Sequence, residues 1–238
     1  MADALLYVTA PARYMLGQKG TAQGTKWAAV DGREGCLKTL LMISKAIDQF
    51  GRWLSRIAVW LVLVAALLSA FNAFFRYFIN EIIVLARHHD QLGMLRGLLD
   101  WYGNNSNAFL EAQWYMFAVM AMFGAAYTLK VNEHVRVDLV YGTVSERMRT
   151  WIDLIGSIVC LVPMCALLAY LTWPWFVDSW YSGEVSTNAG GLVRWPVKLI
   201  VPVGFALVLL QGFSEIIKCV AALTTDYVRE HAYEKPLQ

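Results

Sequence analysis

Histidines and cysteines are the residues of this sequence that could support redox or metal chemistry. A haem-binding membrane subunit needs axial histidines inside its spans, because the iron sits between helices. The four histidines lie outside the long apolar stretches: His88, His89, His134 and His231. A thiol oxidase needs closely paired cysteines. The four cysteines include no C-x-x-C pair: Cys36, Cys160, Cys165 and Cys219. We therefore predict no cofactor, no metal ion and no catalytic residue.

Charged side chains gather at the ends of the apolar stretches and are absent from their middles. A charge inside a membrane span is costly and usually marks a route for an ion or a substrate. The sequence therefore predicts no transport pathway within this chain alone. Arg76 closes the first apolar stretch and Glu111 opens the second, on the same predicted side of the membrane, where each suits its helix dipole. We expect these two side chains to pair, with a role in positioning.

Four apolar stretches must position these groups. The mean hydropathy of +0.46 is too high for an ordinary soluble domain, and 58% of the residues are hydrophobic against 16% charged. The net charge of +2 is too small to indicate nucleic acid. We predict an all-α membrane protein whose membrane domain covers residues 36–223. Its four transmembrane helices are expected at about 55–77, 109–130, 152–177 and 197–220.

The distribution of Lys and Arg predicts the orientation, because short cytoplasmic loops carry the excess. Most of the 20 Lys and Arg residues precede the first span, lie between the second and third, or follow the fourth. We therefore expect both termini to be cytoplasmic (N-in, C-in) in a bacterial inner membrane. Residues 1–35 are predicted to be a flexible cytoplasmic N-terminus and residues 224–238 a cytoplasmic tail.

Two charged segments next to the first span have helical periodicity. Residues 37–54 place polar side chains on one arc and apolar side chains on the other, which predicts an N-terminal amphipathic helix in the membrane interface. The polar arc contains Lys38, Lys45, Asp48, Gln49 and Arg52. The alternative is that this segment extends the first span into the cytoplasm. Residues 82–99 are predicted to form an extra periplasmic helix between the first two spans.

Small residues recur at helical spacing within the first two spans. Ala65, Ser69 and Ala73 follow one another every four residues, as do Ala121 and Ala125. Such spacing lets helix backbones approach closely. It serves either packing within the bundle or a seam with another subunit, and the sequence leaves both open.

Several sequence runs resemble a known family. They are Phe74-Phe75-Arg76-Tyr77, Phe109-Leu110-Glu111-Ala112-Gln113-Trp114, Trp195-Pro196, and the run from Leu129 to Asp138 that contains His134, Arg136 and Asp138. Together they look like the DctQ-type small membrane subunit of tripartite ATP-independent periplasmic (TRAP) transporters. The resemblance covers roughly residues 37–221. The segment from about 81 to 105 is longer than in the shorter members of the family.

The resemblance implies a subunit that braces other proteins and is not an enzyme. In this family a large membrane subunit of the DctM type holds the sodium and substrate sites, and a periplasmic substrate-binding protein delivers an organic acid such as a carboxylate or keto acid. Structural or partner contacts are expected at Arg76, Glu111, Trp114, His134, Arg136, Asp138, Trp195 and Pro196. Docking contacts for the binding protein are expected at Asp178, Arg194 and Lys198, unless these are simply solvated loop charges.

Two other classes of protein remain open on the sequence. A non-haem membrane anchor subunit of an electron-transfer or enzyme complex would need titratable or cofactor-ligating residues deep in its spans. A free-standing helical channel would need polar residues that line a pore.

Overall fold

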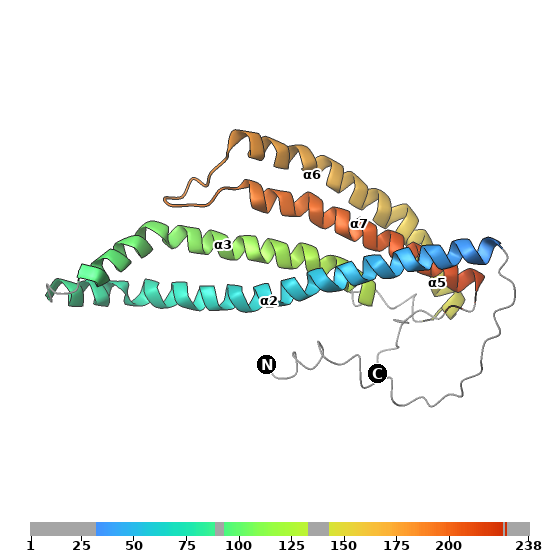
Figure 1. The fold of residues 1–238 in the computed structure, drawn as a ribbon, viewed down its shortest axis with the longest axis horizontal. Coiled ribbons are helices and arrows are strands. Elements are labelled where there is room, and N and C mark those ends of the chain that lie inside the picture. The colour runs from blue at the N-terminus through green and yellow to red at the C-terminus, as the bar shows by residue number, and fades with distance from the viewer. Residues whose placement is uncertain (1–31, 89–92, 133–142, 226, 228–238) are drawn as a thin grey trace, which may run out of the picture. The chain divides into compact units, whose positions relative to one another are not determined.

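The computed structural model describes residues 32–88, 93–132, 143–225 and 227, and the chain divides into two units, residues 1–36 and 37–238. Of the first unit, only the start of helix α2 is described. The helices are α2 (Gly32–His88), α3 (Gly93–Val131), α5 (Glu146–Gly156), α6 (Val162–Ser182) and α7 (Trp195–Thr224), with a π-helical turn, η2 (Ser157–Leu161), between α5 and α6 (Figure 1).

The four predicted spans are confirmed as helices long and apolar enough to cross a membrane. They are Leu37–Ile79, Leu99–Val131, Glu146–Ser182 and Trp195–Thr224. The third runs through α5, η2 and α6 without interruption. Most side chains in these spans face outward, as expected when lipid or another membrane protein surrounds the helices.

Helix α7 lies between α6 and α3 (Figure 1). Glycines on α7 make these contacts close. A Cβ atom at Gly204 would lie 2.5 Å from Met122 Cβ on α3, and one at Gly212 would lie 2.7 Å from Leu161 Cδ2 in η2. These small residues allow the backbones to approach, so α7 acts as the central helix of the described bundle.

Helix α2 corrects the prediction of a separate interfacial helix. It continues without a break over 57 residues, about 85 Å at 1.5 Å per residue, so residues 37–54 extend the first span. The polar arc does not face water throughout, because Asp48 is buried. Phe50 and Trp53, on the apolar arc, are exposed instead.

The prediction of an independent helix at 82–99 is also wrong. Residues up to His88 continue α2 and residues from Gly93 begin α3, with positions 89–92 outside the described residues. The two helices pack where Tyr102 Oη donates a 2.6 Å hydrogen bond to Asn72 Oδ1, and both residues are buried. The long segment is therefore a continuation of two spans.

The π-helical turn η2 ends two residues before Pro163. Proline has no N–H, and its ring crowds the carbonyl four residues earlier, so a widened turn relieves the clash. Pro202 is buried within a continuous α7.

Candidate functional site

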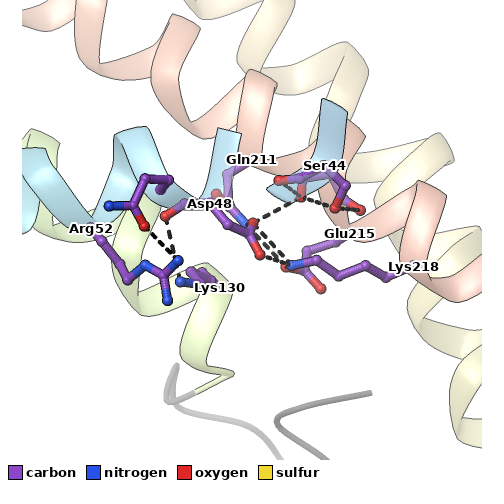
Figure 2. Close-up of polar contacts among 9 residues, drawn as sticks. Ser44, Asp48, Arg52, Lys130, Gln211, Glu215 and Lys218 are labelled. Atoms are coloured by element: carbon purple, nitrogen blue, oxygen red, sulfur yellow. Dashed lines mark hydrogen bonds and ion pairs between the residues drawn. The ribbon is translucent and has the colours of Figure 1, made fainter. Parts of the chain in front are cut away.

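A buried polar network joins α2 to α7 near one end of the bundle (Figure 2). The Asp48 carboxylate on α2 is its centre. Asp48 Oδ1 accepts hydrogen bonds from Gln211 Nε2 at 3.0 Å and from Ser214 Oγ at 2.9 Å. Asp48 Oδ2 forms an ion pair with Lys218 Nζ at 2.8 Å. All three partners lie on one face of α7, so the carboxylate fastens the two helices together.

Neighbouring groups complete this Asp48 network. The hydroxyls of Ser44 and Ser214 lie 2.7 Å apart and are almost inaccessible. Glu215 Oε1 accepts hydrogen bonds from Lys218 Nζ at 2.8 Å and from Gln211 Nε2 at 3.0 Å. The Lys130 ammonium at the end of α3 lies 3.5 Å from the Asp48 carbonyl oxygen. Two carboxylates thus share the Lys218 ammonium group and accept hydrogen bonds from polar side chains, as buried charges require.

A second polar site lies on Glu111, which α3 buries at the other end of the bundle. Its Oε1 accepts hydrogen bonds from the Ser186 hydroxyl and from Asn188 Nδ2, the latter at 2.9 Å. Its Oε2 accepts one from the Leu192 backbone N–H at 2.6 Å. The carboxylate therefore holds the loop between α6 and α7.

The expected pair between Arg76 and Glu111 is not formed. Both oxygens of Glu111 already accept hydrogen bonds from the loop, and Arg76 is exposed on α2. The two residues were predicted on the same side of the membrane, but the hydrogen-bond donors to Glu111 come from the loop between α6 and α7. The sequence offers no signal for this, because the donors are about 80 positions away along the chain.

Glu184 lies in the same loop and bonds it to the flanking ends of α6 and α7. Its carboxylate accepts hydrogen bonds from Lys198 Nζ, from Ser179 Oγ at 3.0 Å and from Arg194 at 3.2 Å. The hydrogen bond from Lys198, followed by that from Ser179, lowers the pKa of Glu184 below its ordinary value. A bridge between Val185 and Val193 closes the loop. We call Glu111, Glu184 and their partners the loop network.

Gly190 fits the loop against α3. Its φ of 68° is in the left-handed region, and a Cβ atom there would collide with the backbone oxygen of Asn104. Asn107 Nδ2 donates a 3.0 Å hydrogen bond to the Ala189 carbonyl oxygen, and Tyr115 Oη donates one of the same length to Val193. The loop is thus attached to α3 along its length.

The predicted contact residues have different positions. Arg194 and Lys198 are engaged with Glu184, whereas Asp178 is exposed. Trp195 packs edge-on against Trp180 with 4.5 Å between ring centroids. Pro196 stands in the first turn of α7, where a missing N–H is harmless, and Trp114 is 67% exposed. His134, Arg136 and Asp138 lie outside the described residues.

The two networks are about one bilayer apart. Lys198 and Lys218 are 20 residues apart on α7, about 30 Å along a helix, which matches the thickness of the hydrocarbon core. Among the described residues, no group of three His, Cys, Asp or Glu side chains could hold a metal ion. This arrangement can fix helices and a loop, and its charged groups satisfy one another.

The family model for "Tripartite ATP-independent periplasmic transporters, DctQ component" matches residues 104–222. The chain belongs to this family. One relative is the "C4-dicarboxylate TRAP transporter small permease protein DctQ" of Pseudomonas aeruginosa, which is 31% identical over 114 residues, or 47% of this chain and 52% of the relative. The chain therefore spans about half the length of the curated relative it matches. No solved structure matches the chain.

Membership of this family of TRAP transporter components agrees with a multi-pass membrane protein, since four helices are long and apolar enough to cross a membrane. The matched residues include Glu111, the α6–α7 loop and Gln211 to Lys218. They do not include α2, which supplies Asp48. Half of the Asp48 network thus comes from outside the matched region.

Proposed function

We propose that this protein is the scaffold subunit of a sodium-coupled TRAP transporter for organic acids. In this proposal a large membrane subunit of the DctM type carries the sodium and substrate sites, and a periplasmic binding protein delivers the substrate. The observation that carries the proposal is the placement of charge: the apolar middles of the four predicted spans have no charged residue, and the carboxylates of both networks accept hydrogen bonds or ion pairs from within the chain.

The geometry supports bracing because both ends of the bundle are fixed. The Asp48 network joins α2 and α7, with Lys130 of α3 alongside, and the loop network joins α3, α6 and α7. A transport domain that moves across a bilayer needs a part that stays still. A bundle fastened at both membrane surfaces can supply that part.

The proposed orientation puts the Asp48 network on the cytoplasmic side and the loop network on the periplasmic side of the inner membrane. The distribution of Lys and Arg supports it, since the segments near the Asp48 network carry most of them. In this orientation both termini are cytoplasmic, and Asp178 is exposed on the side that a periplasmic binding protein would reach.

The proposed substrate class is a carboxylate or keto acid. The relative from Pseudomonas aeruginosa is named for C4-dicarboxylates, which supports this class. Because the apolar middles of the predicted spans offer no charged group, selection of the acid is assigned to the partners.

The test is reconstitution of transport in liposomes with a sodium gradient and radiolabelled succinate as the probe. The large subunit encoded beside this chain is reconstituted with and without it, together with the cognate binding protein. We expect sodium-dependent uptake only when all three are present. Uptake by this chain alone, or full uptake by the large subunit without it, would contradict the proposal.

A further inference from the structure

Helix α2 has two apolar seams on nearly opposite faces. The inner seam recurs every seven residues at Ser44, Gly51, Ala58, Ala65 and Asn72, all of which are buried. Seven-residue spacing is the pattern of helices that pack lengthwise against one another. The inner seam is used within this chain, where Ser44 contacts α7 and Asn72 contacts α3.

The outer seam has the same periodicity but faces away from the bundle. It follows alternating steps of three and four residues from Ile43 onward, and six of its large side chains are Phe50, Trp53, Trp60, Leu67, Phe74 and Phe78. These six side chains are all exposed, with 68% for Trp60 and 62% for Leu67. Other exposed apolar side chains of α2 flank this seam, among them Met42, Val62 and Leu63.

The apolar exposure on α2 is too long for a bilayer to cover. From Ile43 to Phe78 the outer seam extends over 35 residues, which is about 53 Å along a helix. The hydrocarbon core is about 30 Å thick, and even a tilt of about 40°, the upper limit for spans, leaves a projection of about 40 Å. Lipid can therefore cover only part of the outer seam.

A hollow of about 410 Å³ lies on this seam. Its lining comes from α2, with Trp53 and Trp60 two turns apart and Arg56, Ile57, Leu61 and Val64 completing it. The large rings leave a hole between them of the kind that receives a side chain from a facing helix. Two helices pack together when side chains of one enter such holes on the other.

A second copy of this chain is a poor occupant. In a parallel two-fold pair each residue of the seam meets its own equivalent. Arg56 beside the hollow would then face another Arg56. Glu81, which is exposed seven residues after Phe74 of the same seam, would face another Glu81. Like charges opposed in this way are unfavourable, so the seam fits a partner of different sequence.

We propose that the outer seam of α2 is the docking surface for a transmembrane helix of the large subunit, which places a bulky apolar side chain in the hollow and an acidic group near Arg56. This inference rests on the proposed function. It deepens that function by naming the surface through which the scaffold holds the transport subunit.

The test is photo-crosslinking in the assembled complex in its native membrane. Benzoylphenylalanine replaces Trp60, Leu67 or Phe74 on the outer seam, and, as matched controls, Val159, Leu167 or Tyr170 on the third span, which are exposed to a similar degree. We expect adducts with the large subunit from the α2 positions and little or none from the controls. Adducts from the control face alone, adducts between two copies of this chain, or adducts with lipid only would each overturn the inference.

Copurification separates this inference from the function on which it rests. If the unsubstituted chain fails to recover the large subunit in mild detergent, the proposed function fails. If the large subunit is recovered but α2 is not in contact with it, only the docking surface is wrong. The double variant Trp60→Ala with Leu67→Ala should reduce recovery about tenfold or more, as removal of interface anchors does. The variant Val159→Ala with Leu167→Ala should recover it normally.

Discussion

The two polar networks fix the bundle by different means. At one end, the Asp48 carboxylate accepts hydrogen bonds and an ion pair from side chains of a single facing helix. At the other end, Glu111 and Glu184 hold a loop, partly through its backbone. The Asp48 network holds α2 against α7. The loop network fixes the conformation of the loop between α6 and α7, two helices that already pack together. Loss of the first should therefore affect the whole bundle, and loss of the second should stay local.

The largest expected effect comes from Asp48→Ala. The substitution leaves the buried Lys218 with one carboxylate in place of two, and removal of one partner of a buried pair costs about 3 to 5 kcal/mol. Thermal unfolding of the purified protein in detergent should show a clearly lower midpoint. The neighbouring Gln49→Ala is the control, because its contact with Arg52 is exposed and should contribute at most about 1 kcal/mol. Equal losses from both would contradict a special role for the network.

Substitution of Glu111 should loosen the loop and leave the rest of the bundle in place. Glu111→Gln removes the charge that two side chains and one N–H contact, and such hydrogen bonds contribute about 1.5 to 3 kcal/mol each. Hydrogen exchange of residues 183–194 should accelerate, with little change in α2. Arg76→Ala is the control and should leave that exchange unchanged, whereas an equal acceleration would revive the Arg76–Glu111 pair.

Gly190→Ala tests the fit of the loop on α3. The new Cβ atom would clash with Asn104, and alanine tolerates a φ of 68° poorly, so we expect a cost of about 1 to 3 kcal/mol. The matched control is Gly97→Ala within α3, where nothing lies within 4 Å of the added atom. That change should be neutral or mildly stabilising. The rate of protease cleavage within the loop would measure the effect of each substitution.

The smallest effect is a pH dependence of the loop. Because the pKa of Glu184 is lowered in the folded protein, the stabilisation that it contributes is present above the ordinary value of 4.5 and is lost as the pH falls below it. Exchange of residues 183–194, taken relative to the intrinsic rate of an unprotected amide at each pH, should therefore stay constant from pH 7 to about 5 and rise below that range. Glu184→Gln should abolish the rise. A rise that survives the substitution would assign it to another group.

The spans could be predicted from the sequence, but the partners of the polar residues could not. A run of about 20 apolar residues is sufficient to identify a membrane helix, whatever it packs against. A helical wheel shows that Lys38, Asp48 and Arg52 share an arc, but it does not show which medium meets that arc. The prediction placed this polar arc against water at the membrane interface. Asp48 instead meets Gln211, which lies 163 positions away and has no matching signal in the local pattern.

The continuity of α2 also explains the error over residues 37–54. The charged residues of this segment predicted a helix separate from the first span. No residue there ends the helix, and Gly51 lies within it. The presence of Lys218 and Lys130 near the ends of their own spans was visible in the sequence. Only the fold reveals that both reach Asp48, Lys218 at the carboxylate and Lys130 at the backbone carbonyl oxygen.

Because α2 is attached at Asp48 to α7 and at Asn72 to α3, its register is fixed at two points 24 residues apart. A single residue inserted between them would turn one attachment by about 100° relative to the other, so that only one could form. Seven inserted residues would turn it by only about 20°. They would also move it by about 10.5 Å along the helix axis, so the segment should reject whole heptads as well as single insertions or deletions, which makes this helix a ruler for the distance between its two attachments.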